Sequence, residues 1–281
     1  MLSVAPGGFY VDGTVGFAGH AAAVLEASAP DGRLLGCDRD GETLVDARET
    51  LAAYGDRVRL LHSDFRALSV EHLAAAPNGV LLDLGVNSRQ LDDPARGFSF
   101  RNDGPLDMRF DRQAGAAAAE AVHRLPERAL ADVIYRFGEE RASRRIARAI
   151  VAARRRGPLT TTLELAAVVR AAAPRSGRKG LDPATRTFQA LRIYVNQELD
   201  GLDVAVQSLA QRLAPGGRMV VISFHSLEDR QIKHAFRDLA REGGFRLLTR
   251  KPVRPGAAEL ADNPRARSAR LRALVREEQA A

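Results

Sequence analysis

Short apolar runs that end at aspartates constrain the fold of this chain more than any other feature. Residues 9–11 lead into Asp12, residues 33–37 into Asp38 and residues 80–82 into Asp83. A further apolar run covers residues 58–61, and helix-like patterns separate the runs, at 20–27, 43–53 and 70–75. Continuous apolar strands that alternate with helices predict a parallel sheet covered on both faces, the first half of a doubly wound α/β fold.

The pattern changes in the second third of the chain. Between Gly97 and about Arg186 the sequence predicts no strand, only loops and helices such as 127–137 and 140–153. Apolar residues three or four apart over 188–213 then predict one long amphipathic helix, and residues 219–222 a further buried strand. The tail from Arg250 is expected to be loop-like and basic. We therefore expect a Rossmann-like domain of residues 1–97 and 186–281, interrupted after its fourth strand by a mostly helical substrate-recognition insertion at 98–185.

Composition limits the cellular setting and the partners. The formal net charge is +7, and all but three of the 42 basic residues are arginines. Arginine binds phosphate well through two parallel hydrogen bonds, although genome base composition would also explain the bias. With Cys37 as the single cysteine, no intrachain disulfide or cysteine-based zinc site can form. The sequence shows no signal peptide and no apolar run of about 18 residues, so a cytoplasmic location without membrane contact is expected.

A glycine-containing loop follows the first predicted strand. It reads DGTVGFAGH over 12–20, with glycines three residues apart instead of the G-x-G-x-x-G of dinucleotide enzymes. Such a loop lets the backbone approach a ligand at a helix N-terminus. Asp38 is placed to accept hydrogen bonds from two ribose hydroxyls, and Phe65 to lie against an adenine ring. The alternatives are a plain glycine turn with solvated acids, or an NAD-dependent dehydrogenase, which the glycine spacing disfavours.

Several longer strings make the interpretation specific. In chain order they are YVDGT at 10–14, CDRD at 37–40, LLDLGV at 81–86, SRQLDD at 88–93, RGFSF at 96–100, DGPLDMR at 103–109, ATRTFQALRI at 184–193, SFHSLEDR at 223–230 and NPRARS at 263–268. Together they resemble the bacterial 16S rRNA cytosine-N4 methyltransferase family over almost the whole chain. The resemblance implies a class I S-adenosylmethionine-dependent methyltransferase whose partner is 16S rRNA, in its decoding region and within the small ribosomal subunit.

Carried over position by position, the resemblance also implies a set of cofactor contacts. These are Ala18, Gly19, His20, Asp38, Phe65, Asp83 and Gln90. The sequence departs from the family at Ala18, where glycine is usual and where a positive φ would strain alanine. It departs again at Asn87 and Arg89, which replace serine and proline. The family's N-terminal segment, with a histidine and a Pro-Val pair before the first strand, does not precede residue 9.

The expected chemistry needs no metal. Methyl transfer from a sulfonium is an in-line displacement, so positioning carries most of the catalysis. The exocyclic amine of cytosine is a poor nucleophile, and Asp83 is the candidate catalytic residue because it can accept hydrogen bonds from that amine. Cytosine-C5 methylation needs a cysteine nucleophile, and Cys37 lies within the second strand, away from the transfer site.

Candidate substrate contacts come from the later strings. Phe98, Phe100 and Phe224 are expected to hold a flipped base by stacking, and His225 and Glu228 to read its edge; core packing and a helix cap are the alternatives. Arginines expected to bind phosphate are Arg186, Arg192, Arg141, Arg144, Arg145, Arg148, Arg265, Arg267 and Arg270. A non-catalytic RNA-binding assembly factor with a degenerate methyltransferase fold is the alternative function.

Overall fold

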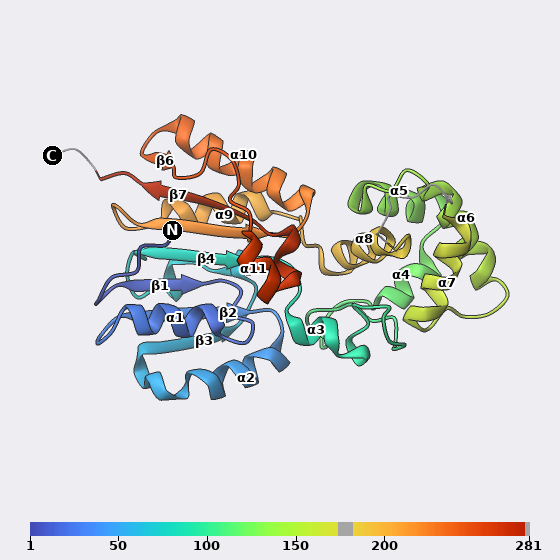
Figure 1. The fold of residues 1–281 in the computed structure, drawn as a ribbon, viewed down its shortest axis with the longest axis horizontal. Coiled ribbons are helices and arrows are strands. Elements are labelled where there is room, and N and C mark those ends of the chain that lie inside the picture. The colour runs from blue at the N-terminus through green and yellow to red at the C-terminus, as the bar shows by residue number, and fades with distance from the viewer. Residues whose placement is uncertain (174–181, 279–281) are drawn as a thin grey trace. The chain divides into compact units, whose positions relative to one another are not determined.

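The chain divides into two compact units (Figure 1). The computed structural model describes residues 1–173 and 182–278. One unit comprises Met1–Gly85 with Gly201–Ala281, and the other Val86–Asp200. The boundaries expected from the sequence lie about a dozen residues further along at the first junction and about fifteen residues earlier at the second. Residues 86–97 and 186–200 therefore belong to the helical unit of the structure.

The first unit is built on a seven-stranded sheet of order β3-β2-β1-β4-β5-β7-β6. The strands are β1 Phe9–Asp12, β2 Arg33–Asp38, β3 Val58–His62, β4 Gly79–Asp83, β5 Arg218–Ser223, β6 Phe245–Leu247 and β7 Arg270–Arg276. The first five are parallel, and β7 runs antiparallel between β5 and β6. All four residues of β1 are buried, as expected for a strand covered on both faces. The predicted Rossmann-like α/β class is confirmed.

The order of the strands creates a switch point beside β1. The chain builds β2 and β3 on one side of β1 and then returns to build β4 and β5 on the other. Open α/β sheets bind ligands at the carboxyl ends of the strands at such a point. The carboxyl ends of β1 and β4 are therefore where a site is expected.

Two parts of the prediction for this unit were wrong. The tail is not only a loop, because β7 pairs with β5 along six residues and β6 pairs with β7. Residues 70–75 do not form an α-helix but a single 3-10 turn at Val70–His72. The α-helices of this unit are α1 Gly19–Ala27, α2 Gly41–Leu51, α9 Leu202–Gln211, α10 Ser226–Glu242 and α11 Ala257–Asp262.

The long helix predicted over 188–213 is also wrong, because it is broken. Helix α8 ends at Asn196 and α9 begins at Leu202. Gln197 and Gly201 both have left-handed backbone conformations, with φ of 50° and 66°. The break coincides with the point where the chain passes from one unit to the other, so the apolar spacing continued while the helix did not.

The second unit is helical. It contains α3 Ser88–Asp92, α4 Ala118–Arg124, α5 Glu127–Gly138, α6 Ser143–Arg154, α7 Thr162–Ala172 and α8 Ala184–Asn196. Its core is its own, and includes the fully buried Leu130, Ile134, Ile146 and Leu165. Among the described residues it has no strand beyond the isolated bridge of Pro105 with Thr161. No helix in the described ranges is long and apolar enough to cross a membrane.

Candidate active site

Three adjacent parallel strands bring carboxylates to one edge of the sheet. Asp12, Asp38 and Asp83 are the last residues of β1, β2 and β4, and β1 lies between the other two strands. Asp12 is in register with Gly36 on one side and with Leu81 on the other. The apolar runs fix this arrangement, because the residue that ends each buried strand emerges at the same edge.

The loop after β1 follows the sheet closely. A Cβ atom on Gly13 would lie 2.3 Å from Leu82 Cδ2 and 2.9 Å from Phe65 Cβ, so only glycine allows the backbone to pass here. Further along, the backbone N–H of Gly16 donates to Asp38 Oδ2 at 2.9 Å. The loop is held against β4 by the hydrogen bond from Gly13 N–H to the carbonyl of Leu81 at 2.9 Å, and against β2 by that from Val15 N–H to the carbonyl of Cys37 at 3.1 Å and by the bond to Asp38.

Helix α1 begins where this loop ends. Ala18 is fully buried and has a φ of 65°, so alanine adopts a left-handed conformation that costs it about 1–2 kcal/mol relative to a right-handed one. The next residue, Gly19, has no atom within 4 Å of the position that a Cβ would take. The backbone at the start of α1 is therefore open to a ligand.

The backbone N–H and one carboxylate oxygen of Asp83 have partners, whereas the other oxygen has none among the described residues. Its backbone N–H donates to Thr14 Oγ1 at 2.6 Å, and its Oδ2 lies 3.5 Å from His20 Nε2. Its Oδ1 is buried and accepts no hydrogen bond from any described residue. The hydrogen bond to Asp83 raises the pKa of His20.

Asp12 is a functional candidate that the sequence analysis did not select, although it ends the first strand. Its Oδ1 accepts from the backbone N–H of Thr14 at 3.1 Å, and its buried Oδ2 has no partner among the described residues. Burial raises the pKa of Asp12 to about 7, against the lowering effects of the Thr14 hydrogen bond and His20. The position at the end of an apolar run was the signal that could have identified it.

Both oxygens of Asp38 accept backbone hydrogen bonds. Oδ1 accepts from Asp40 N and Oδ2 from Gly16 N, each at 2.9 Å. Burial raises the pKa of this carboxyl. The backbone N–H of Arg39 is a third donor to this carboxylate, which offers about four acceptor sites, so room remains for a ribose hydroxyl and the expected contact stays a prediction.

Phe65 lies beside the glycine loop, as its contact with the Gly13 position shows, and is 9% exposed. The preceding Asp64 is paired with Arg66 at 2.6 Å and with Arg39 at 3.2 Å. Burial acts to raise the pKa of Asp64, but the hydrogen bonds and charge of Arg66 outweigh it and the pKa is lowered. This ion-paired turn fixes the backbone on which Phe65 is mounted. Its contact with an adenine ring stays a prediction.

These features fit S-adenosylmethionine. The unpartnered oxygens of Asp12 and Asp83 are acceptors that call for a cationic or hydrogen-bond-donating ligand, because a buried acceptor without a partner is costly. The cofactor offers an ammonium group and two ribose hydroxyls. Asp12 and Asp38 would hold these groups, the open backbone at Gly19 would accommodate the rest, and the free oxygen of Asp83 is an acceptor for the cofactor or for the substrate.

Gln90, the remaining expected cofactor contact, belongs to the helical unit. It is 3% exposed and forms a capping box at the start of α3. Its backbone N–H donates to Asn87 Oδ1 at 2.9 Å, and its Oε1 accepts from Asn87 N at 3.0 Å. Asn87, which departs from the family's usual residue, is therefore the helix cap here.

Two of the three phenylalanines expected to hold the base lie in the helical unit, and both pack against other rings. Phe98 is 8% exposed and stacks on Phe110 with ring centroids 5.6 Å apart. Phe100 meets Phe188 edge-on at 4.7 Å, and the guanidinium of Arg170 lies 5.4 Å from its centroid. The contacts present are those of a core; contact with a base stays a prediction.

The string at 223–230 forms the start of α10. Glu228 Oε2 accepts hydrogen bonds from the backbone N–H groups of Phe224 and His225, at 3.0 and 3.3 Å. In return, His225 Nδ1 accepts from the N–H of Glu228 at 3.4 Å, which completes a capping box. Phe224 is partly exposed and its ring lies 3.5 Å from the Cβ position of Gly85. Phe224 therefore has exposed surface that a base could contact, whereas His225 and Glu228 are buried.

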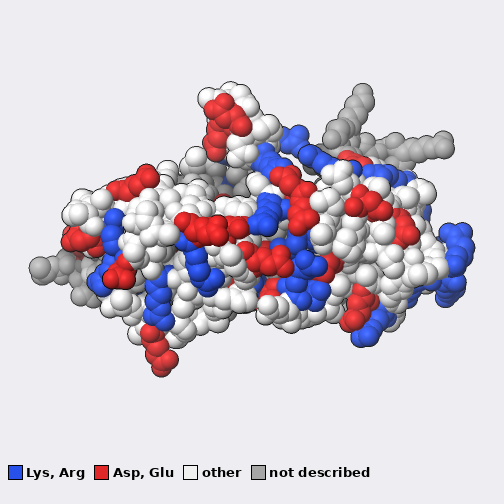
Figure 2. Space-filling view, turned by 90° about the horizontal axis from the view of Figure 1, so that it is seen from below, with Lys and Arg blue, Asp and Glu red and all other residues white. Residues whose placement is uncertain are grey.

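Several of the arginines expected to bind phosphate have structural partners. Arg192 forms a two-point ion pair with Glu198, both bonds at 2.9 Å, and Arg145 donates to the carbonyl of Ala172 at the end of α7. Arg186 lies 3.6 Å from Glu140. Arg141 and Arg144, by contrast, are exposed and form no ion pair with a described residue. On the face drawn in Figure 2, acidic side chains are interspersed among the basic ones, so the net charge does not form one continuous basic surface there.

A Rossmann-like sheet whose switch point carries a glycine loop and three strand-terminal carboxylates defines a class I S-adenosylmethionine-dependent methyltransferase. The profile of the MraW methylase family matches residues 1–277, and this chain belongs to that family.

The curated relatives agree with this assignment. The chain is 49% identical to the ribosomal RNA small subunit methyltransferase H of Geobacter sp. (strain M21), covering 97% of this chain and 94% of that protein. It is 52% identical to the protein of the same name from Sorangium cellulosum (strain So ce56), covering 98% and 87%. Among solved structures, an rRNA methylase from Streptococcus thermophilus aligns with a TM-score of 0.45 at 11% identity, over 99% of this chain and 92% of that one. The family assignment depends on the sequence matches alone.

Proposed function

We propose that this enzyme uses S-adenosylmethionine to methylate the N4 amine of a cytosine in 16S rRNA, in the decoding region and within the small ribosomal subunit. The observation that carries the proposal is the unpartnered, buried Oδ1 of Asp83 at the end of β4. The names of the relatives support the RNA substrate. The cytoplasm, where ribosomal subunits are assembled, is the expected location.

Asp83 is suited to activate an amine. The cofactor supplies a methyl group on a positively charged sulfur. The carboxylate of Asp83 can accept hydrogen bonds from the NH2 group, which favours a pyramidal nitrogen with an available lone pair. Thr14 and His20 hold Asp83 at this position from the glycine loop and from α1. The hydrogen bond to Asp83 raises the pKa of His20 and so favours its protonated form, which orients the carboxylate; the proton that the methylated amine releases passes through Asp83, whose side chain is 30% exposed, to solvent.

The geometry of Cys37 supports N4 over C5 methylation. The thiol is buried and donates to the carbonyl of Gly13 at 3.6 Å, and burial raises its pKa well above the ordinary value. Reactive cysteines have lowered pKa values and accessible sulfur atoms. Cys37 is therefore unsuited to form the covalent intermediate that C5 chemistry requires.

Labelled-methyl transfer to unmodified small ribosomal subunits, followed by nucleoside digestion and mass spectrometry, tests the proposal. We expect N4-methylcytidine as the product, and loss of at least about 100-fold in kcat for Asp83→Asn, since one preorganised polar contact contributes on this scale. Asp56→Asn, which removes an exposed carboxylate that makes no ion pair with a described residue, is the matched control. Recovery of 5-methylcytidine would refute the proposed chemistry. RNA binding without transfer in the wild type would favour the assembly factor.

We propose that RNA is bound chiefly by the helical unit, with Arg141 in the turn before α6 and Arg144 in the first turn of α6 among the phosphate contacts. Both are exposed and neither is neutralised by a described acid. Arg148 is on the same helix face but lies 3.6 Å from Glu127. Arg145 and Arg192 are left out of this set because their guanidinium groups already hold parts of the fold together.

A further inference from the structure

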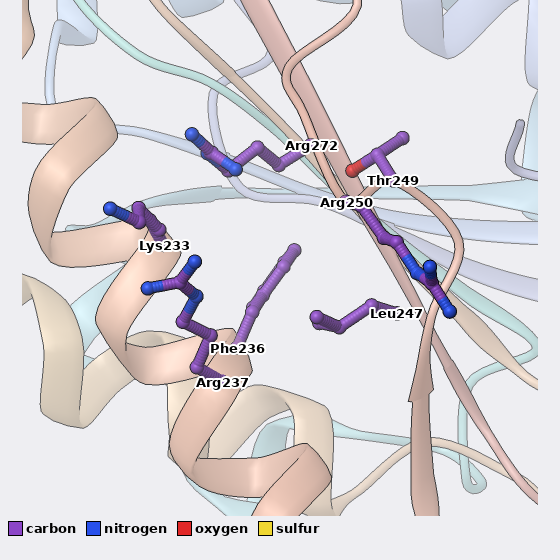
Figure 3. Close-up of a pocket in the computed structure, with 7 residues that line it drawn as sticks. All are labelled: Lys233, Phe236, Arg237, Leu247, Thr249, Arg250 and Arg272. Carbon is purple, nitrogen blue, oxygen red and sulfur yellow. The ribbon is translucent and has the colours of Figure 1, made fainter.

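A small pocket lined by cations lies in the sheet unit, outside the cofactor site. It is formed between α10 and the β6–β7 edge of the sheet, and it is lined by Lys233, Arg237, Arg250 and Arg272 around the apolar Phe236 and Leu247 (Figure 3). No acidic residue lines it. In Figure 3, Lys233 and Arg237 extend from α10 on one side of the Phe236 ring, and Arg250 extends past Leu247 on the other.

One of the four cations is structural and the other three are not. Arg272 is 6% exposed, and its Nε and Nη2 donate to the two oxygens of Asp229 at 2.7 and 3.2 Å. In the part of the chain that the structure describes, Lys233, Arg237 and Arg250 make no ion pair. The pocket therefore keeps three uncompensated positive charges.

Such a grouping calls for an anion. Like charges near one another repel, and the repulsion grows where buried apolar groups lower the local dielectric constant. Phe236, which is 2% exposed, provides such a surface beside Lys233, which is partly buried, whereas Arg237 and Arg250 are exposed. The same surface would strengthen the attraction of Lys233 to a bound phosphate. Ammonium and guanidinium groups are the usual partners of phosphate oxygens.

The pairing of the strands gives the distance between the pocket wall at Arg272 and the edge of the sheet where Asp83 lies. Arg272 pairs with Val221 on β5, one residue before the Ile222 that pairs with Asp83. Strands β4 and β7 are separated by β5 alone, so Arg272 lies about 10 Å along the sheet from the β4 row, at about 4.8 Å per strand. That is the length of about three stacked nucleotides of one strand, at about 3.4 Å each.

We propose that Lys233, Arg237 and Arg250 form a site for a backbone phosphate of the substrate RNA, a few nucleotides from the target cytosine. This inference rests on the proposed function, since it takes RNA as the polyanion. It adds a contact from the sheet unit itself, separate from those assigned to the helical unit. The site positions the strand and carries no base specificity, because phosphate contacts set register without reading sequence.

A salt titration with charge variants tests the site. In Lys233→Gln/Arg237→Gln, we expect the slope of log Kd for RNA against log salt to become shallower by about 1.4, at about 0.7 per lost single-strand contact. The Kd at low salt should rise about fivefold or more, and KM for RNA should rise while kcat at saturating RNA stays unchanged. Affinity for S-adenosylmethionine should not change.

Two matched variants make the result decisive. Lys233→Arg/Arg237→Lys keeps both charges and should retain the wild-type slope. Arg48→Gln/Arg59→Gln removes two exposed charges at the opposite, β3 side of the sheet and should change the slope by less than the pocket pair. If the pocket pair behaved like this control while the wild type still methylated RNA, the phosphate site would be refuted and the proposed function would stand. If the wild type neither bound nor methylated RNA, both would fail.

Discussion

Asp12 makes the free energy of unfolding depend on pH. Its pKa is about 7 in the folded protein against an ordinary 3.8, because burial disfavours the charged form. The folded state therefore keeps a proton that the unfolded chain has released. This contribution to stability is fully present below about pH 4 and is lost as pH rises to about 7. The charges of His20, Asp83 and Asp38 face Asp12 and modify the effect.

Asp12→Asn should remove this dependence. Between pH 5 and pH 8 the wild type should lose about 2–3 kcal/mol more unfolding free energy than the variant, at about 1.4 kcal/mol per pKa unit. Urea unfolding across this range measures the difference. The raised pKa values of His20 and Asp38 leave a common residual slope in both proteins. Identical pH profiles would show that Asp12 does not titrate as described.

Asp38→Ala should weaken binding of S-adenosylmethionine by about 1.5–3 kcal/mol, since hydrogen bonds to a charged group are lost. Part of this loss would come through the loop, because Asp38 also holds the backbone of Gly16. Calorimetric titration measures the dissociation constant, with Asp56→Asn as the control. An unchanged constant would remove Asp38 from the cofactor site.

At the scale of elements, strand β7 depends on a contact between distant parts of the chain. Arg272 on β7 is buried, and its guanidinium is matched by Asp229 in the first turn of α10. Removing one partner of a buried pair leaves the other uncompensated, at a cost of about 3–5 kcal/mol. Replacing both with apolar side chains of similar size is often close to neutral.

A double-mutant cycle tests this pairing. Asp229→Leu should destabilise the protein by about 3 kcal/mol or more, and Asp229→Leu/Arg272→Met should recover most of the loss. Chemical denaturation gives the free energies, and hydrogen exchange at β6 and β7 locates the effect. Additive losses in the double variant would mean that the two side chains stabilise the sheet independently.

Local patterns in the sequence predicted the first four strands, whereas features that depend on distant contacts or on backbone conformation were missed. The first four strands were predicted because each is a local apolar run, and the strand-terminal carboxylates followed from them. Strand β7 was missed because its pattern contains Arg272, which can be buried only through a partner 43 residues away. The break between α8 and α9 was missed because apolar spacing continues through Leu199, while the turn depends on the backbone at Gln197 and Gly201. The capping roles of His225 and Glu228 likewise depend on the backbone around them.

At the scale of the whole molecule, the exposed arginines at the start of α6 offer a test of how RNA is held. Arg141→Gln/Arg144→Gln removes two exposed charges and keeps helix propensity at position 144. The variant should bind RNA with a shallower salt dependence at unchanged cofactor affinity. Arg128→Gln/Arg136→Gln on the neighbouring α5 is the control for exposed charge in the same unit. An unchanged slope would leave this helix face merely solvated, and the basic segment around Arg267 would become the better candidate.

The two separate cores predict that the units can be destabilised independently. Ile146 on α6 is fully buried, and the core residues around it all belong to the helical unit. Ile146→Ala should cost this unit about 2–5 kcal/mol, from lost burial and a residual cavity. Hydrogen exchange should accelerate in α4 to α8. It should stay unchanged in β1 to β5, because the sheet has its own buried core, which includes Leu34, Leu82 and Met219. Affinity for S-adenosylmethionine should change less than about tenfold, or 1.4 kcal/mol, since of the expected cofactor contacts only Gln90 lies in the helical unit. The reciprocal variant, Leu34→Ala, should instead accelerate exchange in the sheet and weaken cofactor binding. Uniform acceleration across both units in either variant would show that the chain unfolds as one cooperative body.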